Sequence, residues 1–357
     1  MQASRASVMP ARRFDFDLIR TIACLSVVMV HASGQFATTI VTRDYFWLST
    51  VLDSLSRAGV PLFVMLSGAL MLDESYVFTR KKWLRHIGHM LLFYFVWSVV
   101  YYCLFSLPEA LADPDAFSLG DMLVTILQGH YHMWFVPMII GLYLILPLLR
   151  LWVRKENRRY VAYFLLLALV FAFVLPQLRN VIICFAPGFD SLYAVYWNMH
   201  LDYPRGYTAY FILGWYLDQF LDACPKRLLQ GLGMAGLCVT IAGTYLMFAL
   251  ERTKEFLFYD NFGVNVLLYA VGIYVLILSR CQRTSYQNRL SHQVVRVISQ
   301  YSLGIYAMHA FFVSKLSRAL IDLPVWQNIL IVFLASAALP IALSAIMKRI
   351  PLLRRCV

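Results

Sequence analysis

The sequence predicts an all-α, polytopic integral membrane protein with about ten transmembrane helices and both termini in the cytoplasm. Of the 357 residues, 61% are hydrophobic and 14% are charged, and the mean hydropathy is +0.67. A soluble domain carries roughly 25% charged residues, so this chain has too few polar side chains to cover the surface of a soluble enzyme. Its apolar and aromatic content also excludes a disordered chain.

Ten apolar segments are long enough to cross a bilayer, which takes about 20 mostly apolar residues. The first follows Arg12 and Arg13 as a signal peptide would, but Arg20 and His31 inside it argue against cleavage and favour a retained span. In chain order the expected spans are 17–37, 54–73, 87–107, 131–149, 160–178, 206–222, 229–250, 262–279, 300–318 and 325–347.

The placement of the basic residues sets the expected topology. With the N-terminus inside, every inner connection holds at least two Lys or Arg, and cytoplasmic loops are characteristically basic. The net charge of +12 therefore reflects the basic residues of the expected cytoplasmic loops, and no nucleic-acid partner is expected. We expect one membrane-embedded domain over 1–357, with short cytoplasmic tails at 1–14 and 348–357 and no fused periplasmic domain. The outer connections hold only Arg43, Arg179, Arg205, Arg252, Lys254, Lys315 and Arg318.

The first span carries the leading candidate site, because an ionisable residue inside a membrane is by default a functional hypothesis. Arg20 and His31 are eleven residues apart, which places them within about 20° of one helix face and about 16 Å apart along the axis. Asp17 lies one turn before Arg20 and can pair with it. The alternatives are an Arg20 that reaches the inner headgroups and a His31 that is packed and hydrogen-bonded to another helix.

Polar and small residues in three later spans are secondary candidates. His132 and Trp134 open the fourth span, where Trp134 also fits an interfacial aromatic belt. His309 lies in the middle of the ninth span, and packing is favoured over catalysis for it. Ser67 precedes Gly68 in LFVMLSGALML, and small residues there favour close helix packing.

Charged residues flank the second span on both sides. Asp53 and Arg57 are spaced as a helical i, i+4 pair, which fits a structural ion pair at least as well as a substrate contact. Lys82 and Arg85 belong to a basic cluster after the span. That cluster is either a topology signal or a binding site for a phosphorylated cytoplasmic ligand.

No motif indicates a metal or a soluble-type active site. The seven cysteines form no CxxC pair and lie mostly in apolar runs, so neither a disulfide nor a zinc site is expected. There is no P-loop and no GxSxG turn. No pair of carboxylates lies mid-span as a proton or sodium relay would require, which weakens a transporter interpretation.

Taken in order, these motifs resemble the integral-membrane acyltransferase family 3, whose members O-acylate cell-envelope glycans. The family's hallmark Arg and His, ten residues between them, correspond to Arg20 and His31 in DFDLIRTIACLSVVMVH. The family's second span is similar to VPLFVMLSGALML. Its middle-span motif is similar to HMWF, which starts at His132, and its late motif is similar to SLGIYAMH, which ends at His309. The likeness covers nearly the whole chain, and SRAGVPLF and SLGIY resemble the enterobacterial common antigen O-acetyltransferase type. Lys82 replaces a usual Arg, which loosens the case for bidentate phosphate binding there.

The resemblance implies an acyl-CoA donor, most often acetyl-CoA, and as acceptor a hydroxyl of a cell-surface or lipid-linked glycan. It implies a location in the bacterial inner membrane and no metal. CoA phosphates would bind at Arg20, Lys82 and Arg85, and the pantetheine arm would follow the first helix towards His31. His31 would act as a general base or carry the acyl group transiently, and Asp17 would orient Arg20.

Other functions remain compatible with the same spans. The principal rival is a multi-span transporter or exporter of a glycan precursor or small solute, and a third reading is a scaffold for polysaccharide machinery. Under the enzyme hypothesis, His132, Trp134, Ser67 and His309 have secondary roles, and aromatic residues in 179–205 are suited to sugar stacking. The acceptor sugar, the acyl group and the oligomeric state are left open by the sequence.

Overall fold

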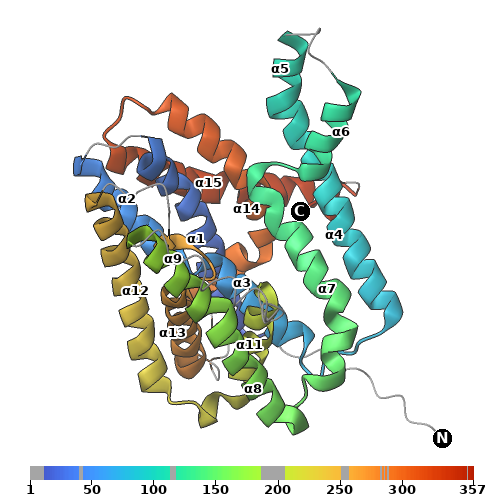
Figure 1. Ribbon diagram of the computed structural model, residues 1–357. Helices are drawn as coiled ribbons and strands as arrows, with labels where there is room; N and C mark the ends of the chain where they lie inside the picture. The colour runs from blue at the N-terminus through green and yellow to red at the C-terminus, as the bar shows by residue number, and fades with distance from the viewer. Residues whose placement is uncertain are drawn as a thin grey trace, which may run out of the picture.

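The protein is built from helices. The computed structural model describes residues 12–39, 43–112, 118–185, 206–250, 257–281, 284, 286–287, 289–351 and 353–357, and these residues contain no strand (Figure 1). The predicted all-α class is therefore confirmed. Tyr193, Tyr196, Trp197 and Tyr203, which are suited to sugar stacking, lie outside the described residues.

Within each described range, consecutive helices are joined by short connections. The α-helices are α1 (Phe14–Thr39), α2 (Arg43–Ser56), α3 (Gly59–Met71), α4 (Arg80–Tyr101), α5 (Leu107–Ala112), α6 (Leu119–Gln128), α7 (Phe135–Trp152), α8 (Arg158–Ala168), α9 (Leu175–Phe185), α11 (Tyr207–Phe220), α12 (Lys226–Ala249), α13 (Val264–Cys281), α14 (Leu290–Ala319) and α15 (Val325–Met347). A π-helical turn joins α4 to α5, and another joins α8 to α9. Figure 1 shows α5 and α6 standing clear of the remaining bundle.

Eight helical stretches within the described residues are long and apolar enough to cross a membrane, which makes the chain a multi-pass membrane protein. They are Phe14–Phe36, Phe46–Met71, Arg80–Ala112, Tyr131–Trp152, Lys155–Phe185, Lys226–Ala249, Leu257–Cys281 and Val325–Met347. The other two expected spans are also helical but differ in kind. The span expected at 206–222 is α11, which has 14 residues, and that expected at 300–318 belongs to α14, whose first turns are polar.

The second crossing is interrupted at Arg57. Pro61 has no N–H to donate to the carbonyl of Arg57, and its ring would clash there, which favours a break in the helix at this point. The break separates α2 from α3. Because of the break, the Arg57 side chain lies at a junction and not within a regular helix.

Helices α1 and α14 run parallel to each other. The hydroxyl of Thr21 near the start of α1 donates to the carbonyl of Val295 at 3.1 Å. Towards the other end, Gln35 donates to the hydroxyl of Ser317. The two helices correspond to the first and ninth expected spans, with seven crossings between them, and an odd number of intervening crossings requires a parallel arrangement.

Two glycines allow α3 and α11 to touch backbone to backbone. A Cβ added at Gly68 would lie 1.7 Å from the carbonyl oxygen of Phe211, and one added at Gly214 would lie 1.9 Å from that of Met65. Neither position can carry a side chain without moving a helix. The interpretation of the Ser67-Gly68 motif as a packing contact is therefore confirmed for Gly68.

The C-terminal segment folds back onto the bundle. The indole N–H of Trp97, well inside α4, donates to the carbonyl of Cys356 at 2.8 Å. Cys356 is buried, and Val357 packs against the hydrophobic core. Residues 353–357 thus have fixed contacts with α4, in contrast to a free tail.

Candidate active site

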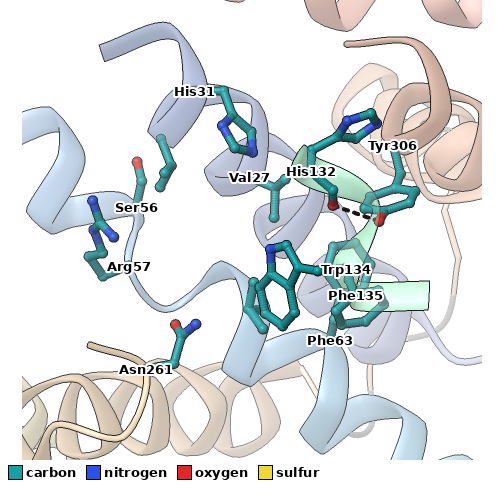
Figure 2. A pocket seen from close by; sticks show the side chains of 12 residues that line it. Val27, His31, Ser56, Arg57, Phe63, His132, Trp134, Phe135, Asn261 and Tyr306 are labelled. Carbon is teal, nitrogen blue, oxygen red and sulfur yellow. Dashed lines mark hydrogen bonds between the residues drawn. The ribbon is translucent and has the colours of Figure 1, made fainter. Parts of the chain in front are cut away.

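A cavity of about 200 Å³ lies where α1, the α2–α3 junction, the start of α7 and α14 meet (Figure 2). It brings together His31, His132 and Trp134, which the sequence places in two different spans. In Figure 2, His31 and Arg57 face this space from one side, and Trp134 and Tyr306 from the other. The lining residues are Val27, Val30, His31, Ser56, Arg57, Val60, Phe63, His132, Trp134, Phe135, Asn261 and Tyr306.

Four imidazoles cluster at this cavity. The ring of His309 on α14 lies with its centroid 5.2 Å from that of His31 and 5.1 Å from that of His132. The Nδ1 atoms of His130 and His132 are 2.9 Å apart, so one of them donates to the other. Side chains that the sequence distributes over three segments therefore form one contiguous group.

The backbone fixes the tautomer of His309. Its Nδ1 lies 2.8 Å from the carbonyl oxygen of Tyr306 and 3.0 Å from that of Ile305, so Nδ1 must carry the hydrogen. The other nitrogen, Nε2, is then an acceptor. It is buried and has no hydrogen-bond partner among the described residues. A neutral His309 can therefore accept a hydrogen bond from a neighbouring imidazole N–H.

Arg57 contributes a positive charge to the cavity wall. Its Nη2 lies 2.5 Å from a carboxylate oxygen of Asp53, which is 1% exposed, and its guanidinium lies over the ring of Tyr259. The structural ion pair expected from the sequence is therefore formed. The same arginine also lines the cavity, so the pairing and substrate-contact interpretations of Arg57 are compatible.

Asp17 and Arg20 lie towards the start of α1, one turn apart. The Asp17 carboxylate accepts hydrogen bonds from Arg12, Tyr286 and, at 2.5 Å, the hydroxyl of Ser299. Burial and the adjacent carboxylate raise the pKa of Tyr286 to about 12, so its hydroxyl remains a donor. Asp17 thereby ties α1 to α14 and to the segment before it.

Arg20 is held more loosely than its neighbours. Its Nη1 lies 3.7 Å from Asp17 and 3.4 Å from the hydroxyl of Ser299, and 31% of its side chain is exposed. Arg20 and His31 both face α14, Arg20 through Ser299 and His31 through His309. The contact between Asp17 and Arg20 is therefore an ion pair. The hydrogen bonds that the Asp17 carboxylate accepts come from Arg12, Tyr286 and Ser299.

Lys82 and Arg85 line a second cavity, an open groove of about 710 Å³ along the first turns of α4. We call this the basic groove. The described residues that line it include no carboxylate. They are Tyr76, Lys82, Arg85, His86, Gly88, His89, Leu92 and Arg355.

A series of contacts through α7 and α3, the last of them to backbone, leads from the basic groove to the His31 cavity. The ring of His86 in the groove lies 4.9 Å from that of Tyr143 on α7. The Tyr143 hydroxyl lies beside Ser67 and within electrostatic range of Arg20. Ser67 in turn donates to the carbonyl of Phe63 at 2.9 Å, and Phe63 lines the His31 cavity. Ser67 therefore belongs to the contacts that connect the two cavities.

Tyr306 and Asn261, which line the cavity, and His130, which lies beside it, were not among the candidates identified from the sequence. His130 is close to the HMWF motif, and Tyr306 is the last residue of SLGIY, so motifs identified in the sequence lie close to both residues. Asn261 follows α12 in a segment with no such signal, and only the tertiary fold brings it to the cavity. Among the described residues, no group of three His, Cys, Asp or Glu side chains is arranged to hold a metal ion.

Comparison with known proteins gives one match. The family model described as an acyltransferase domain, that of acyltransferase family 3, matches residues 13–349. No curated protein and no solved structure matches the chain. The matched range includes every residue that lines the His31 cavity, whereas Arg355 of the basic groove lies beyond it.

Proposed function

Since the chain belongs to the acyltransferase 3 family, we propose that it transfers an acetyl group from cytoplasmic acetyl-CoA to a hydroxyl of a cell-surface or lipid-linked glycan. One observation carries this proposal. A buried group of imidazoles lies inside a bundle of membrane-spanning helices and is connected by side-chain contacts to a basic groove. Such an arrangement suits a reaction whose two substrates approach from different sides.

The basic groove is suited to the phosphorylated end of the donor. Lys82 and Arg85 would form charge-assisted hydrogen bonds with CoA phosphates. The pantetheine arm would pass Tyr143, with Arg20 and Ser67 beside it, and bring the thioester to His31. The groove would then face the cytoplasm of the bacterial inner membrane, where acyl-CoA is available.

His31 would provide the proton transfer. In the direct route it takes the proton of the acceptor hydroxyl as that oxygen attacks the thioester carbon, the C–S bond breaks, and the proton passes to the CoA thiolate. In the covalent route an imidazole nitrogen of His31 attacks the thioester carbon, the C–S bond breaks and CoA leaves as the thiolate. The sugar hydroxyl then attacks the acyl carbon, the C–N bond to His31 breaks, and the hydroxyl proton passes through the released imidazole to the CoA thiolate. In both routes the second ring nitrogen of His31 would keep its hydrogen and donate a hydrogen bond to Nε2 of His309, which would orient the His31 ring.

Arg57 would stabilise the reacting carbonyl of the donor, and Trp134 would bind the acceptor sugar. A cation close to the reacting carbonyl stabilises the negative charge that develops on its oxygen, and Arg57 supplies one in a largely enclosed space. The face of Trp134 suits stacking against a sugar ring, and the amide of Asn261 suits hydrogen bonding to its hydroxyls. A sugar of enterobacterial common antigen is the acceptor we propose to test first.

The test is transfer of label from radioactive acetyl-CoA to glycan in membranes that contain the wild-type protein or His31→Ala. Loss of a general base costs about 10²- to 10⁴-fold in rate, so we expect label to fall to background at normal protein level. His292→Gln is the matched control, because His292 stacks on Phe14 outside the cavity. Mass spectrometry of surface glycans from deletion and His31→Ala strains should show the same missing acetyl group.

Two results would contradict the proposal. Full acetylation by correctly inserted His31→Ala would remove His31 from the chemistry. If wild-type membranes put no covalent label into glycan, and instead accumulate or export an unmodified glycan, the transporter function would replace the enzyme.

A further inference from the structure

The C-terminal segment adds a cation to the basic groove. Arg355 lines the same cavity as Lys82 and Arg85, although more than 260 residues separate it from them in the sequence. Its position is fixed by its neighbours, because the carbonyl of Cys356 accepts from the Trp97 indole at 2.8 Å. The burial of Cys356 and the packing of Val357 against the core hold the segment in place.

The chemistry of the groove favours a phosphorylated ligand with more than one anionic group. Three long cationic side chains and two imidazoles line it, with no carboxylate among the described lining residues. Uncompensated cations at an open groove repel one another, and an anion relieves that repulsion. Lys82 provides a point charge, whereas Arg85 and Arg355 each provide a planar fork that matches phosphate oxygens.

We propose that Arg355 binds a phosphate of the acyl-CoA donor, so that the C-terminal segment forms one wall of the donor site. This inference rests on the proposed function. Arg355 would also compensate for the lysine at position 82. It supplies a second guanidinium to a site where the family usually has an arginine. Acyl-CoA carries a diphosphate and a separate 3′-phosphate, which gives two anionic groups for the two guanidinium forks.

The experiment compares donor kinetics of Arg355→Gln with those of Arg354→Gln in nanodiscs made only of zwitterionic lipid. The control removes the same charge from the adjacent position, which does not line the groove. A hydrogen bond to a charged group corresponds to roughly tenfold or more in affinity. We expect Arg355→Gln to raise the KM for acetyl-CoA about tenfold and to leave the KM for S-acetylpantetheine, which lacks the phosphates, unchanged. Arg355→Lys should give a smaller rise, and Arg354→Gln almost none.

The outcomes separate this inference from the proposed function. If the wild-type protein transfers acetyl groups and the two glutamine variants behave alike, Arg355 has no role in donor binding and the enzyme function stands. An equal KM rise for acetyl-CoA and S-acetylpantetheine would mean a general distortion and would also overturn the inference. The same variants are also measured in nanodiscs that contain anionic lipid. If Arg355→Gln loses activity there and not in zwitterionic nanodiscs, the groove binds lipid headgroups instead of the donor. Absence of any wild-type transfer would refute the proposed function itself.

Discussion

A methyl group at Gly68 should separate two central helices. The added Cβ would lie 1.7 Å from the carbonyl oxygen of Phe211, and ordinary contact begins at about 3.4 Å, so α3 and α11 must move apart by about 1.7 Å. The obstacle is backbone, which cannot swing aside as a flexible side chain can. Overpacking a core costs about 1–3 kcal/mol and occasionally more, and we expect Gly68→Ala to lie at the upper end.

We expect the separation of α3 and α11 to lower both the thermal stability and the activity of the protein. A loss of about 3 kcal/mol lowers the Tm of a chain of this size by about 4 °C, which thermal denaturation in detergent followed by size-exclusion chromatography would measure. Because Ser67 and Phe63 move with α3, the folded fraction should also lose activity, by up to about 10²-fold for a displacement near 1 Å. Gly141→Ala is the control: nothing lies within 4 Å of its added Cβ, and alanine is favoured over glycine in a helix.

The partner position provides a second check. Gly214→Ala should have a similar effect, since its Cβ would lie 1.9 Å from the carbonyl of Met65. The double variant should cost less than the sum of the two, because the first separation already makes room for the second methyl. If Gly68→Ala unfolds at the same temperature as Gly141→Ala, the close approach of α3 and α11 is wrong.

Two further substitutions test the proposed donor and acceptor paths. Arg20→Gln should raise the KM for acetyl-CoA about tenfold with little effect on acceptor preference, because the guanidinium lies within electrostatic range of Tyr143 on the proposed donor path; unchanged donor kinetics would remove it from that path. Trp134→Ala should raise the KM for the glycan by about tenfold and leave that for acetyl-CoA unchanged, because an aromatic face stacks on the sugar alone; a rise confined to acetyl-CoA would reverse this assignment.

The sequence predicts the helices well because the membrane imposes a length and an apolar composition on each span. Eight of the ten expected spans meet that criterion. The two exceptions have specific reasons: α11 has 14 residues, and the span expected within α14 carries His309, Lys315 and Arg318 among its apolar residues. The division of the second crossing at Arg57 follows from Pro61, a local rule that span-length reasoning overlooks.

The site is predictable only where its residues share one helix. Helical geometry places Arg20 and His31 on the same side of α1, and both do face α14. Convergence of His132 and His309 on His31 depends on how separate helices pack, which no spacing in a single sequence contains. The same holds for Arg355, whose approach to Lys82 depends on a fold-back of the chain.

The pairing of α1 with α14 determines which parts of the site can move. Asp17 with Ser299 ties the two helices at one end, and His31 with His309 meets further along. Because both pairs belong to the same two parallel helices, the spacing between the cationic end and the imidazoles is fixed by the helical rise. The remaining walls come from other elements, namely Arg57 at the α2–α3 junction and the short 3-10 helix Tyr131–Trp134 before α7. Substrate access that requires motion should therefore displace those walls while the α1–α14 pair stays together, since separating that pair would also break the hydrogen bond to the buried Asp17 carboxylate.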